Sequence, residues 1–288
     1  FSTPIKGAAK MNRTARLVTV IAVAAALLST AGCNKLKARD QLNKGVQSFR
    51  GANYEEAIGH FQNAVNLDSD LKVAKMYLAT AYAQQYVPGV ETPENLRNAQ
   101  LAIDQYKQVL TTDPHNVTSL KGIAFLYMQQ KKFDEAREYY KKAIDADPND
   151  PETYYSVGVI DWSATYKDAA ELKSKEGLKV DDELKGKGSQ KLCDEMKQKD
   201  GVAVDEGMKM LQTAIDKRQD YDDAMAYMNL LYRRKANDMT CDDAQARAEY
   251  VKTANEWSDK AMAARKKKAE EASKKTSGGI VLDQPKSK

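Results

Sequence analysis

The sequence predicts an all-α fold, a solenoid of about five helix hairpins that ends in a long helix. Three observations support this prediction. Apolar residues recur at three- and four-residue steps, which is the spacing of one face of a helix. An alanine, an aromatic residue four positions later and a small apolar residue three positions after that form a pattern that occurs three times. The pattern belongs to a period of about 34 residues, which is typical of a repeat architecture.

The clearest repeat covers residues 117–150. Its first helix carries a bulky residue, an apolar pair and an aromatic residue, and its second carries small, aromatic and small residues. A proline then ends the second helix, because proline cannot continue a helix. One such hairpin cannot bury its own apolar face, so neighbouring hairpins must stack. These positions are Leu120, Ile123, Ala124, Tyr127, Phe133, Ala136, Tyr140, Ala143 and Pro148.

This arrangement resembles the tetratricopeptide repeat, with Ile123-Ala124 in place of the usual Leu-Gly pair. The resemblance covers about residues 38–270 and implies a right-handed solenoid in which the first helix of each hairpin lines a groove. Degenerate terminal repeats are expected, because they cap the stack. The expected repeats are 38–71, 72–116 with an insertion, 117–150, 151–221 with an insertion at 163–206, and a capping repeat at 222–273 that contains the long helix.

The insertions at 86–97 and 163–206 are expected at the same edge of the solenoid. The longer one is rich in Lys, Asp, Glu and Gly, and we expect a partly mobile flap with little to bury. Cys193 lies in this segment and Cys241 in the next turn. The two cysteines either form a disulfide, worth roughly 2–4 kcal/mol, or remain free thiols.

The pattern of the first 32 residues is typical of a targeting segment. Residues 1–10 precede the expected initiator Met11 and look like upstream sequence. Residues 11–32 combine two arginines, a short apolar run at 17–28 and small residues before Cys33. This order resembles a bacterial lipoprotein signal, which implies cleavage before Cys33 and acylation of its thiol by palmitate or a similar chain. Thr30 departs from the usual pattern, so an ordinary cleaved signal is the alternative.

The apparent positive charge of the chain belongs to the targeting segment. Residues 1–32 hold four basic residues and no acidic ones. Subtracting those four from the 45 basic side chains leaves 41, which equals the 41 acidic side chains. A neutral balance gives no support for nucleic-acid binding.

The resemblance implies a protein-binding scaffold. Catalysis would need a nucleophile with a base, a carboxylate pair in a pocket or a metal. Neither histidine stands in such a motif, and we expect no enzyme activity, no cofactor and no metal. Aromatic and arginine side chains are common interface anchors. The partner-binding groove positions implied by the family are Tyr77, Lys121, Phe125, Tyr155, Trp162, Tyr227 and Arg233.

The expected setting is the periplasmic face of the cell envelope, with envelope proteins or their peptide segments as partners. Attachment to the membrane would occur through the lipid on Cys33. Asn34 follows the lipid site where an Asp would favour the inner membrane, so the outer membrane is favoured. The alternative function is binding of a small ligand or a cell-wall glycan. Residues 274–288 are expected to form a disordered tail.

Overall fold

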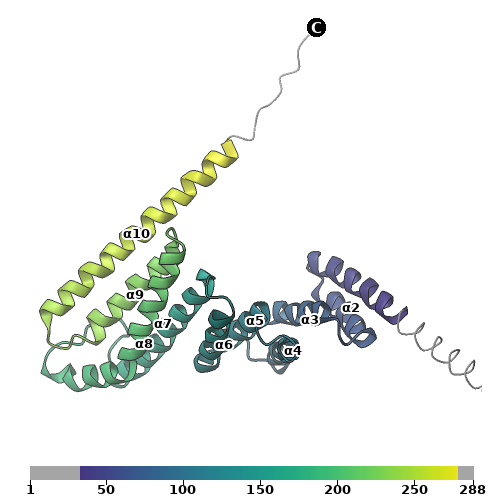
Figure 1. Ribbon diagram of the computed structural model, residues 1–288. Helices are drawn as coiled ribbons and strands as arrows, with labels where there is room; N and C mark the ends of the chain where they lie inside the picture. The colour runs from purple at the N-terminus through teal and green to yellow at the C-terminus, as the bar shows by residue number, and fades with distance from the viewer. Residues whose placement is uncertain (1–32, 278–288) are drawn as a thin grey trace, which may run out of the picture. The chain divides into compact units, whose positions relative to one another are not determined.

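The structure of the chain is a computed structural model, which describes residues 33–277 (Figure 1). These residues form helices joined by turns, and no β-strand occurs among them. The chain divides into two compact units between Thr112 and Asp113, which are described separately. The expected signal segment at 11–32 and the tail beyond residue 277 lie outside the described residues.

The first unit contains two helix hairpins. Residues 33–50 are helical and pair with α2 (Tyr54–Leu67), and α3 (Lys72–Gln85) pairs with α4 (Pro93–Leu110). The ring of Phe61 on α2 is fully buried. A Cβ atom at Gly45 would lie 2.5 Å from that ring, so the two helices cross at a distance that only glycine allows.

The connection between α3 and α4 is shorter than the insertion expected at 86–97. It spans residues 86–92, because Thr92 caps α4 by accepting a hydrogen bond from the Asn95 amide, and Pro93 starts the helix. Asn95 also organises the connection itself. Its side chain accepts from the Val87 amide and donates to the carbonyls of Val87 and Val90. The remaining expected insertion residues form the first turn of α4.

The second unit contains three helix hairpins (Figure 1). The pairs are α5 (Val117–Gln129) with α6 (Phe133–Ala146), α7 (Pro151–Lys175) with α8 (Gln190–Lys217), and α9 (Asp222–Asp238) with α10 (Ala244–Ser277). A short 3-10 helix, η1 (Lys187–Ser189), precedes α8. The long final helix was expected to reach residue 273, and the described residues 274–277 are helical as well.

The expectation of a mobile flap at 163–206 is wrong. Most of this segment extends α7 to 25 residues and α8 to 28 residues. The extended parts have a core of their own, in which Leu184 and Met196 are fully buried. Charged residues dominate the composition of the segment, but its apolar residues lie where the extended parts of α7 and α8 pack against each other. The members of this core are Ala169, Leu184, Leu192, Cys193 and Met196.

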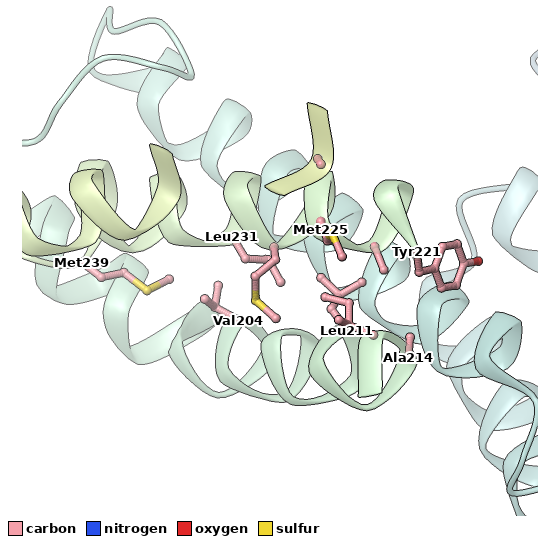
Figure 2. Close-up of a cluster of buried hydrophobic side chains, with 11 residues drawn as sticks. Val204, Leu211, Ala214, Tyr221, Met225, Leu231 and Met239 are labelled. Carbon is pink, nitrogen blue, oxygen red and sulfur yellow. The ribbon is translucent and has the colours of Figure 1, made fainter. Parts of the chain in front are cut away.

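One core of the second unit lies between α8 and α9 (Figure 2). Val204 and Leu211 of α8 face Met225 and Leu231 of α9 across the helix interface. Ala261 of α10 closes the same cluster from the last hairpin. None of the helices over residues 33–277 combines the length and apolar character needed to cross a membrane.

Candidate functional site

A series of aromatic rings lies on the first helices of two successive hairpins, α7 and α9. Tyr155, Trp162 and Tyr166 are spaced by seven and four residues on α7, so they share one helix face. Tyr227 projects from α9 and meets both Tyr155 and Trp162. Tyr221, at the start of α9, extends the series beyond Tyr155. These five residues are called the aromatic ladder below.

The rings of the ladder contact one another in sequence. Tyr227 stands nearly perpendicular to Tyr155 at a centroid distance of 5.7 Å and to Trp162 at 5.3 Å. Trp162 is stacked on Tyr166 at 5.1 Å. Such edge-to-face and stacked pairs hold each ring in a defined orientation. The three central rings are half-buried and Tyr166 is exposed, so the ladder offers a preformed aromatic surface.

The buried end of the ladder is fixed by hydrogen bonds. The Tyr221 hydroxyl donates to Glu152 Oε2 at 2.5 Å, and Arg218 Nη1 donates to Glu152 Oε1 at 2.7 Å. Burial raises the pKa of Tyr221, and its bond to the Glu152 carboxylate adds to this effect. Burial also raises the pKa of Tyr155, with a further contribution from Tyr227. Both phenols therefore stay protonated and can act as hydrogen-bond donors.

Two residues of α5 were predicted to belong to the groove. Phe125 is 45% exposed, which is unusual for a phenylalanine and leaves its ring open to a partner. Lys121 is instead engaged within the unit, because its ammonium lies 2.6 Å from Asp150, the N-cap residue of α7. Burial alone would raise the pKa of Asp150, but hydrogen bonds from Lys121 and Thr153 hold this pKa below its usual value.

The structure brings some predicted groove residues together and separates others. Tyr155, Trp162 and Tyr227 lie in contact. Tyr77 belongs to the first unit, where its ring stacks on Phe61. Arg233 lies apart from the ladder: its guanidinium bonds to Asn255 of α10 at 2.9 Å. Arg233 follows Tyr227 by six residues and therefore lies on a different face of α9.

A buried charge cluster supports the extended hairpin next to the ladder. Lys173 of α7 and Asp238 of α9 are both fully buried and form an ion pair. Arg234 binds the same carboxylate at 2.6 Å and donates to the carbonyl of Thr165 at 2.9 Å. Burial raises the pKa of Asp238, while Arg234 and Lys173 act against that rise. The sequence prediction missed this cluster, although the Arg234 and Asp238 spacing of four residues was a signal.

The edge near this cluster is closed by a disulfide between Cys193 of α8 and Cys241, with Cα atoms 5.5 Å apart. Hydrogen bonds join the α7–α8 connection to the end of α9, to the turn that follows it and to α10. The Leu184 amide donates to the Asn237 carbonyl at 2.8 Å, and the Gly186 amide donates to Asp242 at 2.7 Å. Arg247 donates to the Leu184 carbonyl at 2.8 Å. The ends of α7, α8 and α9 thus form one braced edge.

A family model described as the tetratricopeptide repeat matches residues 96–157. This range covers the second helix of one hairpin, the complete hairpin of α5 and α6, and the start of α7. Residues 96–157 therefore match the tetratricopeptide repeat in sequence, and the helix hairpins of the chain share the fold of tetratricopeptide solenoids. Of the aromatic ladder, only Tyr155 lies within the matched range.

The tetratricopeptide repeats of this chain are similar to those of several known proteins. Mitochondrial import receptor subunit TOM70 of Homo sapiens is 28% identical over 158 residues, and that of Rattus norvegicus is 27% identical. These alignments cover 52% of this chain and 25% of the relatives, so the chain spans about a quarter of their length.

Solved structures of MamA share the fold. One has a TM-score of 0.55 at 14% identity and covers 81% of this chain and 94% of its own. MamA from Desulfovibrio magneticus RS-1 has a TM-score of 0.54 at 16% identity, with coverage of 80% and 96%. The likeness confirms the predicted solenoid of tetratricopeptide hairpins. This fold supports a role in protein–protein interaction.

Proposed function

We propose that this protein is a lipid-anchored scaffold of the bacterial cell envelope that binds a segment of another envelope protein on the aromatic ladder. The observation that carries the proposal is the half-exposed ladder on α7 and α9. Aromatic rings that are already oriented lose little conformational freedom when a partner binds. Exposed Tyr166 provides apolar contact area at one end of the oriented rings, and Phe125 of α5 is a further exposed aromatic residue.

The envelope location is supported by two features of the chain. The signal pattern of residues 11–32 ends at Cys33, whose thiol is exposed. The Cys193–Cys241 disulfide favours an oxidising compartment outside the cytoplasm. In cells, wild-type protein should incorporate labelled palmitate and fractionate with membranes, and Cys33→Ser should do neither. Equal labelling of the Cys33→Ser protein would contradict the anchor.

Binding at the ladder can be tested with peptides selected on the purified protein. Tyr166→Ser and Phe125→Ser should each weaken binding of a selected peptide about tenfold, as expected for the loss of an apolar anchor. Val202→Ser is the matched control, because Val202 is 79% exposed on α8, outside the ladder helices. If Val202→Ser weakens binding as much as Tyr166→Ser, the binding site lies elsewhere.

A peptide suits the ladder better than the alternative glycan ligand. Sugar rings bind proteins by stacking on an open aromatic face. The Trp162 ring is already in contact with two other rings of the ladder. Tyr166 stacks on Trp162, and Tyr227 meets Trp162 edge to face. Saturable binding of a cell-wall oligosaccharide that is lost in Trp162→Phe, without any peptide binding, would favour the glycan instead.

A further inference from the structure

We propose that the first two turns of the helix at residues 33–50 form a contact surface for anionic phospholipid headgroups. This proposal rests on the proposed lipid anchor at Cys33 and extends it. The lipid would then act together with the protein surface beside it, and the membrane would contact the first repeat directly.

The first supporting observation is the absence of a linker between the proposed anchor and the folded chain. Cys33 is already helical, and so is every residue that follows it up to residue 50. At a rise of about 1.5 Å per residue, Arg39 lies only about 9 Å along the axis from Cys33. A lipid on Cys33 therefore brings these two turns within about one Debye length of the headgroups.

The second observation is the charge of these turns. Lys35, Lys37 and Arg39 are all exposed. The nearest acidic residue, Asp40, is paired with Lys44 at 2.8 Å and does not offset them. Clustered basic residues next to a membrane attachment point are attracted by anionic lipid. The mature chain as a whole, this cluster included, is balanced in charge, so the cluster is a local feature.

The third observation is an exposed leucine within the basic cluster. Leu36 is 72% exposed, although leucine is usually buried in a helix of a folded domain. It lies three residues from Cys33, about one turn along the helix. An apolar side chain beside an acyl chain can enter the interface, while the flanking lysines extend their ammonium groups towards the phosphates.

The helix is held firmly on the first repeat. Ala38 is fully buried, and Gln41 shares a hydrogen bond of 2.9 Å with His60 of α2. Further along, Gly45 lies against the buried ring of Phe61. A headgroup contact in the first two turns would therefore be transmitted to the whole hairpin rather than to a loose tail.

The rival basic segment lies at the other end of the chain, on α10. There, Arg265 and Lys268 are bound to Asp222 at 2.8 and 2.6 Å, which reduces their availability. Lys266 and Lys267 remain exposed on the same helix. They provide a matched control, because they are also adjacent basic residues on a helix surface.

The test uses the chain from Cys33 to Lys288, which contains every described helix. Cys33 is the free thiol when Cys193 and Cys241 are paired, so one 14-carbon chain can be attached there through a maleimide. A single chain of this length binds membranes only marginally, which makes added contacts measurable. Partitioning is measured by sedimentation with phosphatidylcholine vesicles and with vesicles that also contain phosphatidylglycerol.

We expect partitioning to rise about tenfold or more when phosphatidylglycerol is present. Lys35→Gln/Lys37→Gln should remove most of this gain, and Leu36→Ser should lower partitioning on both kinds of vesicle. Lys266→Gln/Lys267→Gln should leave the gain unchanged. Circular dichroism of each variant checks that the helices are retained.

Equal partitioning on the two kinds of vesicle would overturn the proposal. Loss of the gain in Lys266→Gln/Lys267→Gln, with the Lys35→Gln/Lys37→Gln protein unaffected, would assign the contact to α10 instead. The lipid is attached chemically, so this result does not depend on acylation in cells. Failure of the cellular anchor is detected separately by palmitate labelling of wild type and Cys33→Ser.

Discussion

Gly158→Ala should destabilise the second unit although alanine is the better helix former. Gly158 lies inside α7, where α7 crosses α8. A Cβ atom at this position would lie 2.5 Å from Cγ and 2.7 Å from Cδ2 of Leu211, and 3.2 Å from the carbonyl oxygen of Gly207. Leu211 is fully buried in the core between α8 and α9, so the new methyl group must displace packed core atoms.

The expected magnitude follows from two opposing effects. Replacing glycine by alanine within a helix gains about 1 kcal/mol of helix propensity. Overpacking a filled core costs about 1–3 kcal/mol, and the nearby backbone oxygen of Gly207 places this case at the upper end. The net loss for Gly158→Ala should therefore be about 1–2 kcal/mol. Gly201→Ala in α8 meets nothing within 4 Å and should gain about 0.5–1 kcal/mol.

Urea unfolding followed by tryptophan fluorescence measures both variants. Trp162 and Trp257 are the two tryptophans of the chain and both lie in the second unit, so the signal reports on that unit. Equal free energies of unfolding for Gly158→Ala and Gly201→Ala would refute the packing argument. The double variant Gly158→Ala/Leu211→Ala should show favourable coupling, because the smaller side chain at residue 211 makes room for the new methyl group.

Three further predictions concern the second unit. Burial and the neighbouring Asp168 raise the pKa of Asp200 from 3.8 to about 7, so the folded chain should lose stability as pH rises across that interval. Asp200→Asn should remove this loss, raising the melting temperature at about pH 8 more than at about pH 5. Replacing Cys193 and Cys241 by alanine opens a loop with a sequence separation of 48 and should cost about 4 kcal/mol in non-reducing urea unfolding. Lys131 has a φ of 59°, so Lys131→Gly should raise the free energy of unfolding by about 1 kcal/mol.

The repeat register could be read from the sequence because it depends on local spacing. Ala136 and Ala143 were assigned to the small positions of the second helix of the clearest repeat, and each is fully buried in the structure. Small side chains at these offsets let the helices of a hairpin approach closely. Both the type of these residues and their spacing therefore predict where the helices pack. Tyr140 occupies the aromatic position of the same pattern and is almost fully buried.

The braced edge could not be predicted from local spacing in the sequence. Lys173 and Asp238 are separated by 65 positions, and each one alone looks like an ordinary solvated charge. Their pairing depends on where α7 and α9 end, which no local pattern fixes. A weaker signal was present in Leu192 and Met196, which are four residues apart and indicate a buried helix face.

Three of the residues predicted for the groove lie in contact with one another in the structure. Tyr155, Trp162 and Tyr227 come together because the family register places them on the first helices of successive hairpins. Tyr166 was missed, although it follows Trp162 by one helical turn and stacks on it. Arg233 was placed in the groove by the family register, and in the structure its guanidinium bonds to Asn229 of α9 and Asn255 of α10.

The braced edge also affects how readily proteases cleave the protein. The connection between α7 and α8 has exposed lysines at 179 and 185, which would make it a trypsin site in a loose linker. The Lys173 ammonium fixes this connection by donating hydrogen bonds to the carbonyls of Val180 and Asp182 at 2.8 and 2.6 Å. Cleavage requires local opening of the chain, and the disulfide at Cys193 opposes that opening. Digestion at this connection therefore reports whether the cysteines are oxidised, without any chemical label.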